Sequence, residues 1–518
     1  MAEIADEQLK ALNQVPSLLT KLTRGIEKES LRVTPSGYLS PEPHPLGLGS
    51  ALTHPNITTD FSEAQLELIT DVNPSVEASV RQLENVHRFV YQNLDQELLW
   101  ASSMPCMIGE DKDIPIGRYG SSHIGRVKSI YRLGLGNRYG RLMQTISGIH
   151  HNFSIPETLW PILAEAKGQN LCQDFQTRSY FGLIRNFRRY SWLLIYLFGA
   201  SPAVCKTFTK NLNHNLEDLG NGTLYLPHAT SLRMGRLGYQ SDAQGSLHVS
   251  YNSLENYAET IREALTKPYP AYEDIGFEED GEYGQLNSSL IQIENEFYGT
   301  IRPKRRIASG ERPLNSLLER GVEYVEVRCL DLNPFLRVGI DACQMRFLDT
   351  FLLYCLLAPS PDDSREESAQ MISNQLTVVE QGRKPGLTLA KNSQTVSLEQ
   401  WANTIIEQCG RVAKLIDAAE SSDDHKYSVD LQAKKVSHPE HTPSARIIET
   451  MQTQSIPFYR FAMNQSIAHK GYFNEHPLTD EVSTEFMDEA RHSLERQQKI
   501  EQSDTVDFSE FLQTYLQL

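Results

Sequence analysis

Several signals that mark secreted or membrane proteins are missing from this 518-residue chain. Its seven cysteines are scattered without CxxC spacing, a pattern that favours a reducing cytosol over a disulfide framework. The first residues have neither a basic start nor an apolar core, so we expect no secretory signal. The longest apolar run, 351–358, is far shorter than the roughly 20 residues needed to span a bilayer. These absences predict a cytoplasmic protein without a membrane segment.

The common nucleotide-binding loops are also missing. No GxxxxGK[ST] sequence occurs, and the glycine-rich run 134–140 lacks GxGxxG spacing and a preceding strand. Any nucleotide would therefore be held without a P-loop or a Rossmann loop. The formal net charge of −17 argues against nucleic acid or an anionic membrane as a partner. A small anionic substrate stays possible, because a few cations or a metal can reverse the local field.

The most informative stretch is 24–33, RGIEKESLRV. In a strand, side chains alternate between two faces, so Glu27 and Glu29 would project from the same face. Carboxylates enclosed in a protein need protons, cationic partners or a metal. The alternative is a solvated strand face whose charges alternate with Lys28 and Arg32.

Similar acid-bearing apolar stretches recur downstream, and together they supply an oxygen-rich set of candidate ligands. Five carboxylates and one imidazole suit Mg²⁺ or Mn²⁺ better than zinc. Basic groups close to them in sequence would suit phosphate oxygens. The alternative is an ordinary sheet with cross-strand Glu–Arg pairs, in which a lone histidine is a satisfied core residue. The candidate metal ligands are Glu27, Glu29, Asp60, Glu67, His150 and Glu326, and the basic groups are Lys304, Arg305 and Arg328.

Apolar periodicity divides the chain into three parts. Residues 1–24 are expected to form an amphipathic N-terminal helix, and residues 25–360 an α+β catalytic core. Residues 361–518 are expected to be mostly helical and packed on the core, with a loop-like stretch at 420–444. Alternatively, the helical stretches from residue 397 onward form a separate domain.

Eight motifs carry a resemblance to a known family: RGIEKESLRV (24–33), ITTDFSEAQLELIT (57–70), SMPC (103–106), LMQTISGIHHNFS (142–154), YLFGASPA (196–203), TSLR (230–233), QIENEFYGTIRPKR (292–305) and GVEYVEVR (321–328). The chain resembles the proteobacterial-type glutamate–cysteine ligases, which belong to the glutamine-synthetase-like carboxylate–amine ligases. The resemblance implies a curved, mainly antiparallel sheet that forms the active-site hollow and is covered by helices. It also implies a monomer that binds small molecules only.

The implied activity is ATP-dependent joining of the γ-carboxylate of L-glutamate to the amine of L-cysteine. The reaction passes through γ-glutamyl phosphate and is the first step of glutathione biosynthesis, with Mg²⁺ or Mn²⁺ as cofactor. By similarity the six acidic and imidazole candidates hold metal, Glu27 and Arg328 are catalytic, and Lys304, Arg305 and Arg328 bind the nucleotide. Arg233 would pair with the cysteine carboxylate. The other implied substrate-binding residues are Phe61, Tyr131, Leu135, Gln144, Asn152, Tyr239 and Tyr298.

From the residues alone, two other functions stay open. A metal-dependent hydrolase would use the same acids with a metal-bound water, although HExxH-type zinc spacing is absent. A non-catalytic acidic protein would bind divalent ions or partners on separate surfaces. The strictness for cysteine over close analogues and any feedback inhibition by glutathione cannot be read from the sequence.

Overall fold

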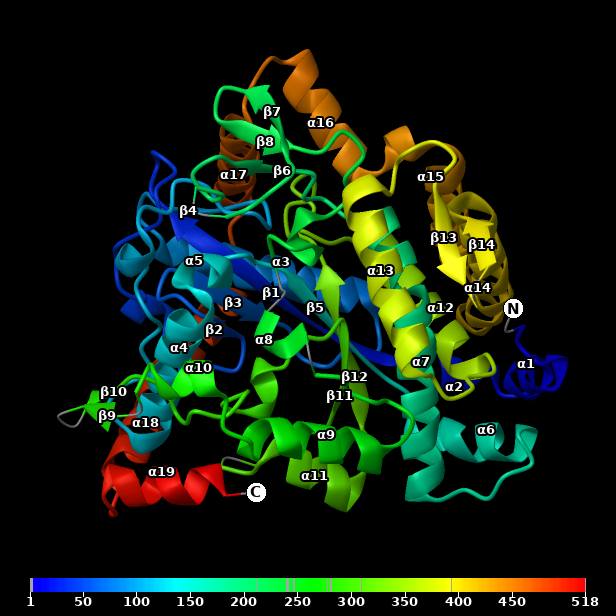
Figure 1. The fold of residues 1–518 in the computed structure, drawn as a ribbon, viewed down its shortest axis with the longest axis horizontal. Coiled ribbons are helices and arrows are strands. Elements are labelled where there is room, and N and C mark those ends of the chain that lie inside the picture. Colours follow the sequence, from blue (N-terminus) through cyan, green and yellow to red (C-terminus); the bar gives the residue numbers. More distant parts are fainter. Residues whose placement is uncertain are drawn as a thin grey trace.

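An antiparallel sheet of seven strands lies at the centre of the computed structural model (Figure 1). The structure describes residues 3–210, 212–238, 242–245, 247–276, 278–279, 282–308, 310–392 and 394–517. The strand order is β11-β12-β5-β1-β3-β2, with β4 paired to one end of β1. The strands are β1 (Thr23–Val33), β2 (Ile57–Thr59), β3 (Gln65–Ile69), β4 (Leu98–Leu99), β5 (Ile149–Ser154), β11 (Ile301–Lys304) and β12 (Tyr324–Leu330).

One face of this sheet is covered by three long helices, α3 (Val76–Asn93), α7 (Gln173–Phe198) and α12 (Ala342–Leu357). Each begins at a residue whose side chain accepts a hydrogen bond from a backbone N–H of the first turn. The N-caps are Ser75, Cys172 and Asp341. Their buried apolar residues belong to one large cluster with the side chains on that face of the sheet, so the opposite face is left for chemistry.

The two basic side chains that alternate with the glutamates of β1, Lys28 and Arg32, are buried. Lys28 is 4 % exposed, and its Nζ lies 2.7 Å from His87 Nε2 behind the sheet. Arg32 is fully buried and donates to Glu97 at 2.8 Å. The alternative of a solvated β1 face is therefore wrong.

Two expectations about helical segments, at residues 1–24 and 420–444, need correction. The N-terminal segment forms two short helices, α1 (Asp6–Asn13) and α2 (Pro16–Leu19), and Thr23 already belongs to β1. Pro16 cannot continue a helix from residue 12, because it lacks a backbone N–H to bond the carbonyl there. The stretch expected to be loop-like contains the helix α15 (Asp424–Ser437). Its buried Val429 and Val436 hold it on the core.

The C-terminal helices pack against the sheet-bearing part. Trp401, Ile405 and Cys409 of α14 (Leu398–Glu420) share the large apolar cluster with residues of α1, α7 and α12. Among the described helices, none is long and apolar enough to cross a membrane. The other C-terminal helices are α13 (Arg365–Gln381), α16 (Pro443–Thr453), α17 (Phe458–Glu475), α18 (Asp480–Ser503) and α19 (Phe508–Leu516).

Shorter elements fill the connections between these parts. The remaining helices are α4 (His123–Tyr139), α5 (Arg141–Gln144), α6 (Trp160–Ala166), α8 (Asp242–Gly245), α9 (Leu254–Thr266), α10 (Pro270–Glu273) and α11 (Pro313–Arg320). The remaining strands are β6 (Ala203–Cys205), β7 (Glu217–Gly220), β8 (Thr223–Tyr225), β9 (Glu278–Glu279), β10 (Glu282–Tyr283), β13 (Thr388–Lys391) and β14 (Gln394–Ser397).

One cysteine pair is bonded, contrary to the expectation from the scattered spacing. Cys106 and Cys205 form a disulfide with Cα atoms 5.6 Å apart across 99 residues of sequence. Spacing along the chain could not reveal it, since the two segments meet only in the folded protein.

Candidate active site

Strand register brings the predicted acids onto one face of the sheet. Glu27 of β1 lies opposite His150 of β5, and Glu29 lies opposite Glu67 of β3. Directly paired residues of antiparallel strands project from the same face. On β12, Glu326 lies opposite Asn152 of β5, two residues from His150 and so on that face too.

This face opens into a cavity of about 530 Å³. Its other walls come from α4, from the segments 293–298, 307–308 and 310–313, and from Tyr515 of α19. All six predicted metal ligands line it, namely Glu27, Glu29, Asp60, Glu67, His150 and Glu326.

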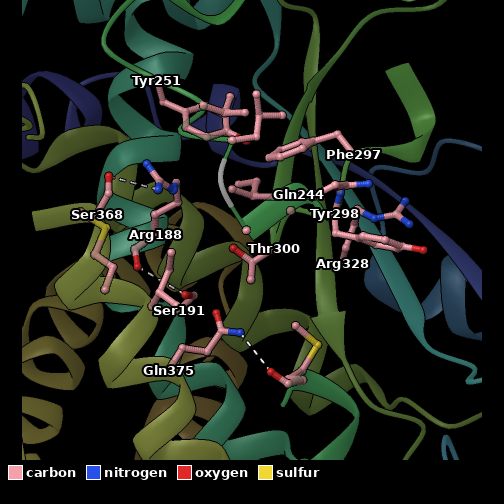
Figure 2. A pocket seen from close by; sticks show the side chains of 18 of the residues that line it. Arg188, Ser191, Gln244, Tyr251, Phe297, Tyr298, Thr300, Arg328, Ser368 and Gln375 are labelled. Carbon is pink, nitrogen blue, oxygen red and sulfur yellow. Dashed lines mark hydrogen bonds between the residues drawn. The ribbon is translucent and has the colours of Figure 1, made fainter. Parts of the chain in front are cut away.

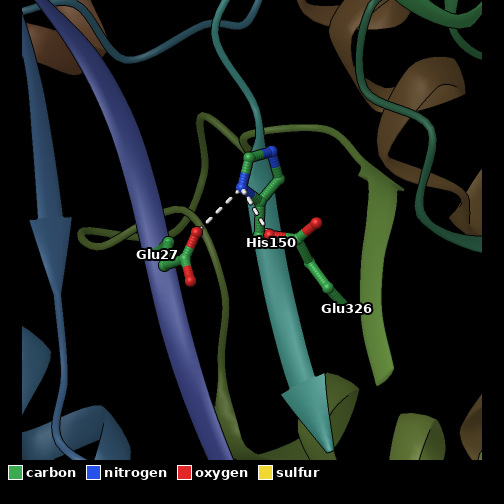
Figure 3. A group of neighbouring side chains, drawn as sticks. All are labelled: Glu27, His150 and Glu326. Carbon is green, nitrogen blue, oxygen red and sulfur yellow. Dashed lines mark hydrogen bonds and ion pairs between the residues drawn. The ribbon is translucent and has the colours of Figure 1, made fainter. Parts of the chain in front are cut away.

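Three of these residues form a compact group of possible ligands (Figure 3). His150 Nδ1 lies 3.1 Å from Glu27 Oε2 and 4.0 Å from Glu326 Oε1. One ligand atom from each residue lies within 4.8 Å of the other two. Burial, with Arg328 nearby, lowers the pKa of His150, which keeps its ring neutral and able to bind a cation. Asn152 donates to the other oxygen of Glu27 at 2.8 Å and so holds that carboxylate in place. This donor set fits a hard divalent ion.

The neighbouring carboxylates are crowded. Burial raises the pKa of Glu29 to about 8, and the negative charge of Asp60 adds to the effect. Burial likewise raises the pKa of Glu67 well above its usual range, together with the charges of Glu27 and Asp60. Glu29 is held by the backbone N–H of Gly148 at 2.7 Å. Such crowding favours bound cations, because a cation relieves the repulsion between the acids.

A group of cations lies at the β11–β12 end of the cavity. Lys304 Nζ lies 3.3 Å from Glu326 Oε1, and Arg328 Nη1 lies 3.2 Å from Oε2. Burial alone would raise the pKa of Glu326, but Lys304 and Arg328 outweigh it and hold this pKa well below its usual range. Oxygen ligands for metal and cations for phosphate therefore lie side by side.

Arg305, one of the three cations predicted to bind the nucleotide, lies away from the cavity. Among the residues that the structure describes, Arg305 does not line the cavity, and its guanidinium donates to the Gly321 carbonyl at 3.2 Å. Arg302 lies in the cavity wall instead, 3.9 Å from Glu326 Oε2. Register explains the difference, since Arg302 pairs with Glu326 and β11 ends at Lys304.

Most residues of the predicted amine pocket line the same cavity. Gln144 donates to the hydroxyl of Tyr298 at 3.0 Å. Aromatic and aliphatic side chains from β2–β3 and α4 complete a small, partly apolar surface. Asn152, also predicted to bind substrate, is not among the described residues that line this cavity, and it donates to Glu27. Tyr239 lies outside the residues that the structure describes. The members that line the cavity are Phe61, Tyr131, Leu135, Gln144 and Tyr298.

Arg233 lines a second, adjoining cavity of about 340 Å³. Tyr298 and Arg328 line both cavities, and Figure 2 shows them among the side chains of the second. The Arg233 side chain is 1 % exposed, lies 3.8 Å from Asp331 Oδ1 and donates to the Arg328 carbonyl at 3.0 Å. A buried guanidinium held in this way is suited to a substrate carboxylate.

Two cavity acids that sequence reasoning did not assign are already neutralised. Glu294 is held by both sides of the Arg312 guanidinium, at 3.2 and 2.9 Å. Glu296 accepts from Arg138 at 3.0 Å and from Tyr139 at 2.8 Å. Their charges are matched by protein groups, whereas the glutamates of β1 and β3 lie among other carboxylates in the cavity.

A sheet face that combines clustered carboxylates, cations and an adjoining, partly apolar pocket is the arrangement expected of a group-transfer enzyme. Comparison with known proteins gives the particular family. Residues 8–378 match the family model described as glutamate-cysteine ligase, and the chain belongs to this family.

Relatives cover nearly the whole length. The chain is 50 % identical over 516 residues to the glutamate–cysteine ligase of Pseudomonas putida, covering 99 % of this chain and 98 % of the relative. It is 49 % identical over 521 residues to that of Azotobacter vinelandii, with 99 % and 98 % covered. A crystal structure of the Francisella tularensis glutamate–cysteine ligase in complex with AMP has a TM-score of 0.90 and 36 % identity. That match covers 96 % of this chain and 97 % of the other. Family membership excludes the alternatives of a hydrolase and a non-catalytic acidic protein.

Proposed function

We propose that this protein joins the γ-carboxylate of glutamate to the amine of cysteine at the expense of ATP. The observation that carries the proposal is the convergence of β1, β3, β5 and β12 on one cavity, which brings clustered acids, cations and a partly apolar pocket together. The AMP bound to the Francisella tularensis relative supports a nucleotide site in a fold of this kind.

In the first step, an oxygen of the glutamate γ-carboxylate bonds to the γ-phosphorus of ATP, and the bond from that phosphorus to the β–γ bridging oxygen breaks. The products are γ-glutamyl phosphate and ADP. Negative charge on the transferring phosphoryl group is matched by the side chains of Arg328 and Lys304 at the β12 end of the cavity.

In the second step, the cysteine nitrogen bonds to the γ-carbonyl carbon and the bond from that carbon to the phosphate oxygen breaks. The amine gives up a proton to solvent as phosphate leaves. Arg233 holds the carboxylate of the amine substrate, and the Gln144–Tyr298 pair borders its side chain. Because the acyl phosphate hydrolyses readily, the enclosing cavity also protects it from water.

Glu27, His150 and Glu326 would hold one divalent ion. Glu29, Asp60 and Glu67 line the same cavity and would supply ligands for another. Mg²⁺ or Mn²⁺ held by these residues would neutralise phosphate charge. The donor set is all oxygen apart from one imidazole, which suits these ions.

The test is a product assay with ATP, glutamate and a panel of amines that includes cysteine, 2-aminobutyrate and serine. We expect ADP release and a γ-glutamyl product, identified by mass, only when ATP, glutamate and an amine are all present. A chelator should abolish both, and added Mg²⁺ or Mn²⁺ should restore them. Glu27→Gln should fold normally and lose turnover. Sustained ADP release without an amine, or product formation without ATP, would refute the proposal.

We further propose that the protein is a cytoplasmic monomer. Light scattering of the purified chain should then give a mass near 58.7 kDa. A larger mass at micromolar concentration would contradict the monomer, and recovery from a membrane or secreted fraction would contradict the location.

A further inference from the structure

The last helix of the chain is attached to the wall of the catalytic cavity. Phe508 and Leu512 of α19 are buried in a small apolar cluster with Val127 of α4 and Leu286. The Arg126 guanidinium lies over the Phe508 ring, 3.8 Å from its centroid. In Figure 1, α19 (red) lies close to α18. This helix is beyond residue 378, where the match to the family model ends.

The attachment brings Tyr515 to the cavity. Its side chain is among those lining the acidic cavity, together with Ile307 and Pro313 from the segment after β11. Arg312 connects the two parts, because it donates to the Tyr515 carbonyl at 3.1 Å and lies 5.7 Å from the centre of the tyrosine ring. The charge of Arg312 is matched by Glu294, and Glu311 of the same segment is paired with Arg320 at 2.8 Å. Ile307, Pro313 and Tyr515 give the rim its apolar and aromatic surface.

The position of the rim relative to Lys304 indicates which substrate reaches it. Lys304 lies beside Glu326, and the rim residues 307–308 and 310–313 follow closely in the chain. The rim is therefore a wall of the same cavity that contains Lys304 and Arg328. The Gln144–Tyr298 pair of the amine pocket comes from other elements, although Tyr131 of that pocket packs on the same small cluster as Tyr515. Of the three substrates, the nucleotide alone carries a large planar group that an aromatic rim suits.

We propose that α19 forms the outer wall of the nucleotide pocket and that the nucleoside of ATP packs against Tyr515. Tyr515 thereby determines affinity for the nucleotide, although it lies outside the matched family segment. The inference rests on the proposed function, since it requires ATP to bind in the acidic cavity.

The experiment compares Tyr515→Ala, Tyr515→Phe and the control Gln513→Ala, which changes an exposed residue of the same helix. For Tyr515→Ala we expect KM for ATP to rise on the order of tenfold, the usual effect of removing an aromatic ring from a base. The KM values for glutamate and cysteine, kcat and the unfolding temperature should change little. Tyr515→Phe and Gln513→Ala should behave as the wild type. Calorimetric titration with ADP, which needs no turnover, should show the same order of affinities.

A second variant, His248→Ala, tests whether the nucleoside binds in the second cavity instead. His248 lines the second cavity, and His248→Ala should leave KM for ATP unchanged. If His248→Ala weakens ATP and Tyr515→Ala does not, the nucleoside lies in the second cavity and the inference is overturned. An unchanged affinity for ADP in Tyr515→Ala also overturns it. A wild-type protein that forms no product with ATP would instead refute the proposed function.

Discussion

Gly148 lies between Glu29 of the acidic cavity and Arg233 of the second cavity. Its replacement by alanine tests the role proposed for Arg233. Its backbone exchanges hydrogen bonds with Glu29, donating to the side chain at 2.7 Å and accepting from the backbone N–H at 3.0 Å. A methyl group on Gly148 would overlap Nη2 of Arg233 and would lie 2.5 Å from its Cζ and 2.9 Å from its Nε. Ordinary contact begins at 3.4 Å.

The guanidinium therefore has to move by on the order of 1 Å, and a displacement of that size can cost about 10²-fold in rate. The buried position of Arg233 next to Asp331 leaves little room for a harmless shift. Gly148 does not have a positive φ, so alanine introduces no backbone strain. We expect kcat/KM for cysteine to fall by about 10–100-fold, mainly through KM.

The assay is steady-state kinetics with each substrate varied in turn, together with thermal unfolding. Gly25→Ala is the matched control, because Gly25 lies on the neighbouring strand β1 and a methyl group there would meet nothing closer than 3.8 Å. Arg233→Lys should affect the same substrate, since a forked donor becomes a point charge. A folded Gly148→Ala protein with unchanged KM for cysteine would refute the assignment of Arg233 to that carboxylate.

Three further substitutions test the charges around the sheet. Glu67→Gln should raise the unfolding temperature of the metal-free protein, because it relieves the repulsion between neighbouring carboxylates. It should also lower activity by about 10²-fold, because it removes a proposed metal ligand. A lower unfolding temperature would contradict the first expectation. Lys28→Met should stabilise the protein at pH 7 by roughly 4 kcal/mol. Burial lowers the pKa of Lys28 from 10.5 to about 7. Between pH 7 and about 10.5 the unfolded chain therefore binds one proton more than the folded protein, and the stability of the wild type rises with pH in this range. Denaturant unfolding should show the advantage of the variant shrinking toward pH 10, and a constant advantage would exclude this cause. Asp349→Ala leaves the buried Arg24, 3.0 Å from Asp349 Oδ2, without its partner, and should cost about 3–5 kcal/mol in the same measurement; a loss below about 1 kcal/mol would show that the pair contributes little.

Local alternation made much of the sheet predictable from sequence. The period of two in 24–33 and 321–331 placed Glu27 with Glu29 and Glu326 with Arg328 on common faces, and all four line the cavity. The strand order β11-β12-β5-β1-β3-β2 could not be read in this way, because pairing joins residues far apart in the chain. The opposition of Glu27 and His150 is a property of that pairing.

Where a strand ends, alternation stops giving information. Arg302 and Lys304 share a face within β11, whereas Arg305 follows its last residue. The sequence shows three cations within four residues, and only the end of the strand decides which of them face the acids. Tyr515 and the Cys106–Cys205 pair escaped prediction for a related reason, since each is defined by contacts across the fold.

The acids themselves cannot be sorted by sequence chemistry alone. Glu294 and Glu296 lie in a motif as acidic and apolar as that of Glu27, and they line the same cavity. Arg312 and Arg138 already match their charges. A carboxylate paired with a buried guanidinium and remote from other acids gains little from a metal ion, while one that lies among other carboxylates gains more. Glu326 contacts Lys304 and Arg328, but it also lies in one group with Glu27 and His150. What distinguishes a ligand from a structural acid here is therefore the identity of its neighbours in space, which the fold supplies.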